Sequence, residues 1–582
     1  MRRLSWLAVA FLSSALLAAQ RPPTAVTKPV TVTGGRVSGV PGRHPSIVAF
    51  KGIPFAAPPV GEWRWQAPAP VVPWQGVRKA ESFGASCMQT IVQERKPWTY
   101  EFMAHNEISE DCLFLNVWTG ASSPRDHRPV FFYIYGGGFN EGSTDVPVYD
   151  GEGLAKKGVV VVTANYRVGV LGFLAHPELS KESGAGVSGN YGLLDQIAAL
   201  KWVHDNIAAF GGDPNQVTIA GQSAGGMSVH YLTASSLGKG LFHRAIVQSG
   251  GSSVSRTGIT VGGKVLADAE AEGQKFAESK GARSLADLRA MSWKTLTEAP
   301  QERPAAGTGR VGATPGIRFS PIVDGYLLTA PVAQVVAEGK QNDVPTLTGA
   351  NAGELGGLSG PPTAVTVDSF VKRATQQYGA MVDEFLRLYP ATTDEQAATA
   401  QAQSSRDQAL VSMFLWAKQR ARTARTKVFT YLWDHTIPGP DAARYGAFHT
   451  SEVPYFMNTL YMSDRPFAEL DHKIADRMSS YVANFVKTGD PNSKGLPRWA
   501  PVGDRPEVME VGDKTEPVPL AGDAAKYAFF EKFLTTPAAP PKQEAALTRQ
   551  HLIPKLTSVE AVRSGLTQAE ACGLHPAHGQ LK

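Results

Sequence analysis

The sequence predicts an α/β fold in which helices wind around a mostly parallel sheet. Apolar runs rich in β-branched and aromatic residues, such as Pro129–Tyr135 and Val159–Thr163, are typical of strands buried on both faces. Between such runs, apolar residues recur at helical spacing from Leu193 to Phe210. A third run, Val217–Gln222, passes through a Gly-rich turn into a helical stretch. Strands that alternate with helices in this way favour a doubly wound sheet.

The expected elements follow one another along the whole chain. Strands are expected at 30–40 (a hairpin), 47–50, 112–118, 129–135, 159–163, 217–222, 243–249, 344–349 and 427–433. Helices are expected at 193–210, 227–232, 265–280, over much of 369–425, at 470–487 and at 526–534. Residues 55–74, rich in Pro, Gly and Trp, should form an ordered irregular segment. The signal is weaker over 252–317, and insertions of this kind usually lie over an active site.

Composition places the chain among ordinary globular proteins. Of its 582 residues, 43% are hydrophobic and 19% are charged. The net charge of +5 is small for this length and gives no indication of nucleic-acid binding. The length permits several domains or one large α/β domain.

Residues 1–19 have the features of a signal peptide. A basic start, Met1-Arg2-Arg3, precedes an apolar run that ends in small residues. The run, Leu4–Ala19, is short for a membrane span, which needs about 20 residues. We therefore expect a secreted or periplasmic protein with no membrane span after removal of the signal; an uncleaved anchor is the alternative.

Three cysteines are present, Cys87, Cys112 and Cys572. An oxidising compartment permits one disulfide among them. Pairing of Cys87 with Cys112 would close a loop of about 25 residues, contribute about 3 kcal/mol in the chain-entropy model and leave Cys572 over.

The stretch from Val217 to Gly226 contains the pattern Gly-x-Ser-x-Gly, with Ser223 at its centre. A strand that turns sharply into a helix at such a Ser is the nucleophile elbow of α/β-hydrolases. Gly221 and Gly225 suit a turn too tight for side chains. The helix N-terminus behind Ser223 offers free N–H groups to a developing oxyanion. By itself the pattern also arises by chance in a chain with 58 glycines.

A second Gly-rich turn, Gly136-Gly137-Gly138, directly follows the apolar strand expected at 129–135. Three glycines leave backbone N–H groups that can approach a ligand. The turn corresponds to the HGGG-type oxyanion loop, with Tyr135 in the His position. The alternative is a turn that binds nothing.

Further motifs stand in a fixed order along the chain. They are Phe-Lys-Gly-Ile-Pro-Phe-Ala at 50–56, Pro-Pro-Val-Gly at 58–61, Ser-Glu-Asp-Cys-Leu-Phe-Leu-Asn-Val at 109–117, Tyr-Gly-Gly-Gly-Phe at 135–139, Asn-Tyr-Arg at 165–167, Gly-Asn-Tyr-Gly-Leu-Leu-Asp-Gln at 189–196 and Phe-Gly-Gly-Asp-Pro at 210–214. Together with the elbow, they resemble the type-B carboxylesterases (the carboxylesterase–cholinesterase group) from about residue 29 to residue 534. Among bacterial members the chain looks most like the para-nitrobenzyl-esterase type.

The resemblance implies a Ser–Glu–His triad in that chain order. Ser223 matches the nucleophile, and His449 matches the base in a Gly-x-x-His-x-x-Glu stretch. Glu354 matches the acid, although this chain has Leu355 where the family usually has Gly. Such a triad cleaves carboxylic esters through an acyl-enzyme, and it needs neither a cofactor nor a metal.

The same resemblance implies an oxyanion hole formed by the N–H groups of Gly137, Gly138 and Ala224. Cys87 and Cys112 match the pair that closes a loop beside the active-site gorge of the family.

Three further positions match the surroundings of the triad. Ser249 and Glu452 match buried positions behind it, where a purely structural role is the alternative. Gln222 stands where many relatives have Glu, directly before Ser223, and should border the pocket without adding a charge.

The sequence therefore predicts an α/β-hydrolase fold with large helical and loop insertions over the active site. The catalytic domain is expected at 20–536, and a Pro-rich linker and tail of unassigned role at 537–582. The expected activity is hydrolysis of small-molecule carboxylic esters. An amide or carbamate hydrolase of the same fold is an alternative. A non-catalytic binding member is another, although such members typically lack the nucleophile or the base.

Overall fold

The computed structural model describes residue 26 and residues 28–255, 258–259, 263–297, 319–354 and 364–536. Three of the predicted features lie outside these residues: the signal peptide at 1–19, the linker and tail at 537–582, and Cys572 within that tail. No helix within the described ranges is long and apolar enough to cross a membrane.

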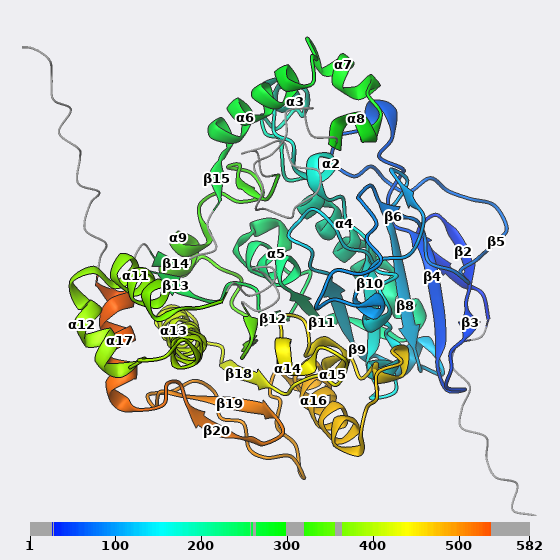
Figure 1. Cartoon of the computed structure of the whole chain (residues 1–582). Coiled ribbons are helices and arrows are strands. Elements are labelled where there is room, and N and C mark those ends of the chain that lie inside the picture. Colours follow the sequence, from blue (N-terminus) through cyan, green and yellow to red (C-terminus); the bar gives the residue numbers. More distant parts are fainter. Residues whose placement is uncertain are drawn as a thin grey trace, which may run out of the picture. The chain divides into compact units, whose positions relative to one another are not determined.

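Within the described residues, 11 strands form one large sheet (Figure 1). In spatial order they are β20 (Thr515–Pro519), β19 (Glu507–Gly512), β18 (Val428–Asp434), β17 (Thr346–Asn351), β12 (Arg244–Gln248), β11 (Gly212–Gln222), β9 (Arg128–Ile134), β10 (Val160–Ala164), β8 (Phe114–Thr119), β4 (Val48–Pro54) and β3 (Val40–Pro41). The strands from β19 to β10 run parallel to one another. Antiparallel pairs flank these parallel strands on both sides. Because the central strands are parallel, the predicted mostly parallel sheet is confirmed.

The centre of the sheet is apolar on both faces. Val130–Ile134 of β9 and all of β10 are buried. Val130 lies in register with Val160 on one side and with Val217 on the other. Burial on both faces explains why these strands read as continuous apolar runs rather than as alternating ones.

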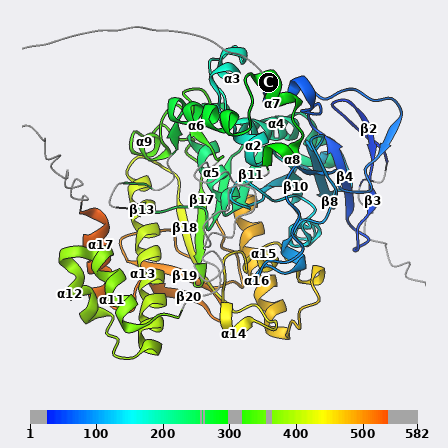
Figure 2. The same ribbon diagram turned by 45° about the horizontal axis from the view of Figure 1, so that its top comes forward.

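Helices pack against this sheet and against one another (Figure 1, Figure 2). They are α1 (Glu152–Ala155), α2 (Gly169–Phe173), α3 (Pro177–Glu182), α4 (Tyr191–Asn206), α5 (Ala224–Ala234), α6 (Leu266–Ser279), α7 (Leu285–Ala290), α8 (Trp293–Thr297), α9 (Val332–Ala337), α11 (Val367–Tyr378), α12 (Val382–Leu388), α13 (Asp394–Ala421), α14 (Ala442–Tyr445), α15 (Val453–Phe456), α16 (Glu469–Thr488) and α17 (Ala524–Thr535). Helix α5 contacts β11 and β12, α13 contacts β17 and β18, and α16 contacts β9 and β11.

The helical pattern predicted over 369–425 is divided among three helices. Helix α11 ends at Tyr378, and Gly379 follows with a φ of 55°, which favours glycine. Pro390 lies between α12 and α13, and the Thr393 side chain caps α13 by accepting from the Gln396 N–H. Helices α13 and α17 pack together, as do α12 and α17, and both views show α11, α12 and α17 side by side (Figure 1, Figure 2).

Smaller sheets form in addition to the large one. The predicted hairpin is present as β1 (Val30–Val32) and β2 (Gly35–Ser38), and β5 (Val77–Lys79) pairs with β2. Short pairs also form between β6 (Ser86–Cys87) and β7 (Ile108–Ser109), between β13 (Val254–Ser255) and β14 (Gly258–Ile259), and between β15 (Lys264–Val265) and β16 (Ile322–Val323). The segment 55–74 is irregular, as expected.

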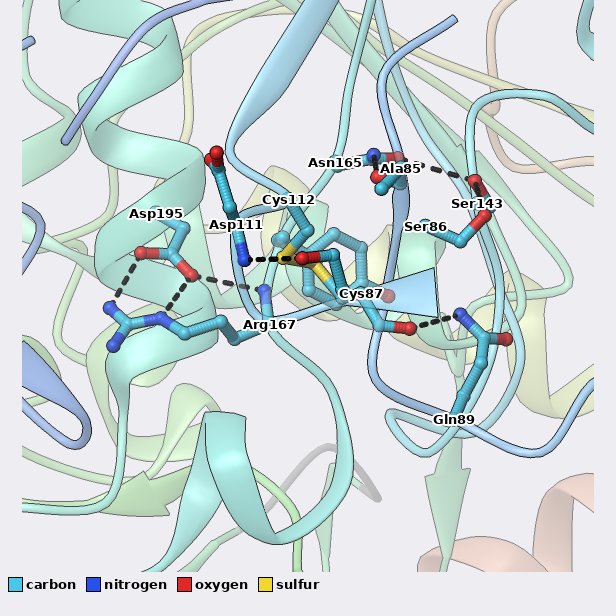
Figure 3. Close-up of a disulfide and its surroundings, with 12 residues drawn as sticks. Ala85, Ser86, Cys87, Gln89, Asp111, Cys112, Ser143, Asn165, Arg167 and Asp195 are labelled. Atoms are coloured by element: carbon cyan, nitrogen blue, oxygen red, sulfur yellow. Dashed lines mark hydrogen bonds and ion pairs between the residues drawn. A yellow bond between two sulfur atoms is a disulfide. The ribbon is translucent and has the colours of Figure 1, made fainter. Parts of the chain in front are cut away.

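Cys87 and Cys112 form a disulfide that closes the loop between them (Figure 3). The Gln89 side chain folds back over this loop and donates to the carbonyls of Cys87 at 3.0 Å and Gly142 at 2.8 Å. Beside it, Arg167 donates through Nε and Nη2 to the buried carboxylate of Asp195 at 2.8 and 2.7 Å. The contact of Gln89 with Gly142 ties the loop from 87 to 112, called the disulfide loop below, to the segment after β9.

Candidate active site

The turn between β11 and α5 holds Ser223 in a backbone conformation that few residues adopt. Its φ is 56° and its ψ is −122°. A non-glycine residue at positive φ is strained unless its surroundings hold it there. The Ser223 N–H donates to the Gln248 carbonyl at 2.8 Å, and its own carbonyl accepts from the Met227 N–H at 2.9 Å. The predicted elbow is therefore present and is tied to β12 and to α5.

The two glycines of the pattern are required by close backbone contacts. A Cβ on Gly225 would lie 2.0 Å from the Ile134 carbonyl oxygen. A Cβ on Gly221 would lie 2.4 Å from the Gly225 carbonyl carbon. Any side chain at these positions would push the helix away from the sheet.

The loop after β9 passes directly beside Ser223. Gly137 and Gly138 have φ values of 104° and 62°. A Cβ on Gly136 would lie 3.0 Å from the Ser223 Cβ. No acceptor for the N–H groups of Gly137 or Gly138 is found among the described residues. Ala224 is the first residue of α5, where backbone N–H groups have no partner within the helix. These amides are available to a ligand oxygen.

His449 and Glu354 meet on the other side of the site. His449 Nδ1 forms a hydrogen bond with Glu354 Oε2, which becomes an ion pair when the ring is protonated. Glu354 Oε1 accepts from the Ser249 hydroxyl and, at 2.8 Å, from the Asn351 N–H. The carboxylate therefore has both oxygens engaged, and it presents a fixed partner to the ring.

The two ionisable groups shift each other's pKa. Burial opposes the charged form of Glu354, but attraction to His449 and hydrogen bonds from His449, Ser249 and Asn351 outweigh burial and lower its pKa. Burial likewise opposes the charged form of His449, but attraction to Glu354 and the hydrogen bond to it raise the pKa of the imidazole. The pair thus favours a carboxylate beside a ring that readily takes a proton.

Glu452 is a second carboxyl group behind the pair and is fully buried. It accepts from Asn351 Nδ2 at 2.6 Å and from Gln248 Nε2 at 3.2 Å. Burial raises its pKa to about 7. Asn351 connects the two carboxyl groups, because its backbone contacts Glu354 and its side chain contacts Glu452. Asn351 stands three residues before Glu354 in the sequence, and Sequence analysis did not single it out.

Gln222 contacts the other ring nitrogen of His449. Its Nε2 lies 3.1 Å from His449 Nε2. Since Nδ1 is paired with Glu354, we assign the proton to Nδ1, so that Nε2 accepts from the amide. Within the described residues no hydrogen bond joins the Ser223 hydroxyl to His449, although Ser223 is the next residue after Gln222. The predicted position of Gln222 beside the site is thus accompanied by a direct contact that the sequence did not indicate.

The tip of the disulfide loop also reaches the site. Trp98 Nε1 donates to the His449 carbonyl at 3.2 Å and to the Thr450 hydroxyl. The Arg95 guanidinium lies 5.4 Å from the centroid of the Trp98 ring and forms an ion pair with Glu141. The Glu141 N–H donates to the Gly137 carbonyl at 3.2 Å. Arg95 and Trp98 therefore connect the loop after β9 to the segment that carries His449, and sequence analysis identified neither residue.

The polar groups of the site are side-chain oxygen and nitrogen atoms and backbone N–H groups. Across the described ranges, no group of three or more His, Cys, Asp or Glu residues is arranged to hold a metal ion.

Comparisons with known proteins agree with this geometry. At 39% identity over 489 residues, 82% of this chain aligns with 85% of a fumonisin B1 esterase of Sphingopyxis macrogoltabida. At 32% identity, 80% of the chain aligns with 91% of a para-nitrobenzyl esterase of Bacillus subtilis (strain 168). At 29% identity, 83% of the chain aligns with 89% of liver carboxylesterase B-1 of Rattus norvegicus. Residues 26–530 match the model described as "Carboxylesterase family". The chain therefore belongs to the carboxylesterase family, with the α/β-hydrolase fold, and is a carboxylic-ester hydrolase.

Proposed function

We propose that the chain is an exported serine esterase in which Ser223 is the nucleophile, His449 moves the proton and Glu354 orients His449. The observation that carries this proposal is the hydrogen bond between His449 Nδ1 and Glu354, which lies beside the strained turn at Ser223. A ring held through Nδ1 keeps its lone pair on Nε2, as a general base requires. Export is supported by the disulfide between Cys87 and Cys112, because disulfides persist in oxidising compartments.

In the acylation step, Ser223 Oγ bonds to the ester carbonyl carbon while its proton passes to His449 Nε2. The electron pair of the carbonyl bond moves to its oxygen, which the N–H groups of Gly137, Gly138 and Ala224 stabilise. Each such donor is worth about 2.7–4 kcal/mol in the transition state. The charged His449 then gives its proton to the leaving alkoxide oxygen as the carbon–oxygen bond breaks.

Deacylation repeats the sequence with water. His449 Nε2 removes a proton from a water molecule as the water oxygen bonds to the acyl carbon. The carbon–oxygen bond to Ser223 then breaks, Ser223 recovers the proton, and the carboxylic acid leaves. In both half-reactions the Gln222 amide has to yield its place at His449 Nε2 to the reacting hydroxyl, since that nitrogen has one lone pair.

The substrates that appear in the names of the relatives are the starting point for finding which acyl and alcohol groups this esterase prefers. We propose fumonisin B1 and para-nitrobenzyl esters as the first compounds to assay, beside a series of chromogenic esters of increasing acyl length. Matched amides and carbamates belong in the same series, since a triad of this kind can also cleave them.

The test is labelling by an organophosphate followed by peptide mass spectrometry, together with steady-state kinetics. We expect one phosphoryl adduct at Ser223 and a loss of kcat of about 10⁴-fold or more in Ser223→Ala and in His449→Ala. Ser236→Ala, an exposed Ser beyond the end of α5, is the control and should keep full activity. More than a tenth of wild-type activity in pure Ser223→Ala protein would contradict the assignment. An unlabelled, inactive wild type would favour a binding member instead.

A further inference from the structure

A small cavity is lined by residues from the C-terminal half of α5, toward the end of that helix away from Ser223. Residues of α5, α9, α13, β12 and β17 and of the segment after α9 line it. Its volume of about 20 Å³ compares with the roughly 10–15 Å³ that one water molecule needs on the same measure. The space therefore suits one or two particles of the size of water, and it excludes larger anions and organic molecules.

Unpartnered buried polar atoms are concentrated in this cavity. Arg420 Nη1, Trp416 Nε1 and both amide atoms of Gln341 have no protein partner among the described residues. Exposure is 4% for Arg420, 2% for Trp416 and 8% for Gln341. Arg420 and Trp416 are four residues apart on α13, so they lie on one side of that helix. A buried donor without a partner costs about 1–3 kcal/mol, which argues for a ligand that accepts from these groups.

The other polar side chains of the lining are already engaged. His230 Nε2 is paired with the Ser252 hydroxyl at 2.9 Å, and the Thr233 hydroxyl donates to the His230 carbonyl. Asn342 Nδ2 donates to the Ser235 carbonyl at 2.9 Å, and the Thr346 hydroxyl donates to a neighbouring carbonyl. The groups left for a ligand are therefore the donors of Arg420, Trp416 and Gln341 and one amide oxygen.

The charge of the lining is positive. No carboxylate is among the described residues that line the cavity, and burial lowers the pKa of His230 to about 3, so that His230 is neutral at neutral pH. Arg420 keeps its charge. Within the described part of the chain its carboxylate partner is Asp343, which is partly exposed and lies 3.5 Å from Nη2, the nitrogen that also donates to the Val344 carbonyl at 2.7 Å. Nη1 makes no hydrogen bond to any described residue.

We propose that this cavity binds a small monovalent anion of halide size, with chloride as the ion available in solution. Arg420 Nη1, Trp416 Nε1 and the Gln341 amide nitrogen are its ligands. The ion would join α13 to the segment after α9, against the face of α5 that carries His230 and Thr233. The site is separate from the triad and does not depend on the proposed function.

Thermal unfolding in defined salts tests the proposal on the full chain. The protein is exchanged into sodium gluconate, whose anion is too large for the cavity, and chloride or bromide is then substituted at constant ionic strength. We expect the Tm to rise with halide and to level off as the site fills, because a ligand bound only to the folded state stabilises it by mass action. A Tm that is unchanged, or that rises without limit in step with any added salt, contradicts a site.

Two tryptophan variants distinguish halide binding in the cavity from general effects of salt on stability. Trp416→Phe keeps an aromatic ring but removes the N–H, and should move the midpoint of the halide dependence to about tenfold higher concentration. Trp202→Phe is the matched control: Trp202 Nε1 is also buried and unpartnered, but Trp202 lies on α4 outside the cavity. Equal midpoints in the two variants would overturn the proposal. If Trp416→Phe does not fold, Gln341→Leu takes its place with the same expected shift.

Crystals of the protein grown in sodium bromide give the direct measurement. Anomalous scattering should place one bromide within hydrogen-bonding distance of Arg420 Nη1. Density for water alone in the cavity, with bromide only at the molecular surface, shows that the site binds water and not an anion.

Discussion

The Gln222 amide nitrogen lies 3.1 Å from His449 Nε2, on the opposite edge of the ring from Glu354. The imidazole is thus held between a carboxylate at Nδ1 and an amide donor at Nε2. An N–H that points at Nε2 favours the neutral ring. A carboxylate in the same place would accept from a protonated Nε2 and favour the charged ring. The identity of residue 222 therefore acts on the protonation of the base.

The first prediction is that Gln222→Glu moves the acidic limb of the kcat/KM profile to higher pH. In the proposed mechanism His449 must be neutral to act as the base, so we expect activity to fall as the pH drops through its pKa. The added carboxylate stabilises the charged ring and raises that pKa, and each unit corresponds to about 1.4 kcal/mol. Gln222→Met, which adds no charge, is the control and should leave the limb well below that of Gln222→Glu. An acidic limb that stays in place in Gln222→Glu contradicts the assignment of Gln222 beside the base.

The second prediction concerns the charge of the substrate. A unit charge 4–6 Å away in surroundings with an effective dielectric of about 20 is worth roughly 3–4 kcal/mol before screening. Gln222 carries no charge, so we expect poor hydrolysis of choline esters, good hydrolysis of neutral esters and tolerance of a carboxylate on the substrate. The measurement is kcat/KM for matched neutral, cationic and anionic esters. Gln222→Glu should move the ratio toward cations, and an unchanged ratio would show that selectivity is set elsewhere.

The third prediction is that Trp98→Phe lowers kcat about tenfold with little change in KM. The variant keeps the ring against which Arg95 lies, but it removes the N–H that donates to the His449 carbonyl and to Thr450. The net worth of such a hydrogen bond, about 1–1.5 kcal/mol, corresponds to that factor. Trp63→Phe changes a Trp that is 51% exposed and should have no effect. If both variants retain wild-type kcat, the contact does not help to position His449.

The fourth prediction is that Glu452→Gln flattens the dependence of Tm on pH. In the folded protein the pKa of Glu452 is raised from its ordinary value near 4.5 to about 7. The folded state therefore holds a proton that the unfolded state releases, and stability falls as the pH rises from about 4.5 to 7 by roughly 3 kcal/mol from this group. Calorimetry from pH 4.5 to 8 should show a smaller decline in the variant. An identical slope in both proteins would mean that Glu452 titrates normally.

The sequence predicted the parts of the site that depend on local backbone geometry. Gly221 and Gly225 indicated a turn too tight for side chains. The apolar run of β9 indicated that the glycines after it lie at the end of a buried strand. The contacts that the sequence did not predict join distant segments. Trp98 and His449 are 351 residues apart, and their contact exists only because the disulfide loop is held against the sheet. Gln222 was expected at the pocket, but its contact with the ring depends on where the loop after β18 places His449.

The cavity beside α5 is another feature that the sequence did not predict. Trp416 and Gln341 look like ordinary interior residues in the sequence, and Arg420 like a basic residue near the end of a helix. Only the packing of α13 against α9 and β17, and of α5 against α9 and β12, brings them to one cavity. No pattern of spacing along the chain encodes that arrangement.

The positive φ of Ser223 lowers the stability of the folded protein at the position proposed for the nucleophile. Conformations of this kind cost a side chain on the order of 1–3 kcal/mol, whereas glycine adopts them readily. Ser223→Gly would relieve the strain in the turn between β11 and α5, and the greater freedom of glycine in the unfolded chain would offset part of the gain in stability. With Ser223 as the proposed nucleophile, selection for stability alone would favour glycine at this position, whereas selection for turnover keeps the serine.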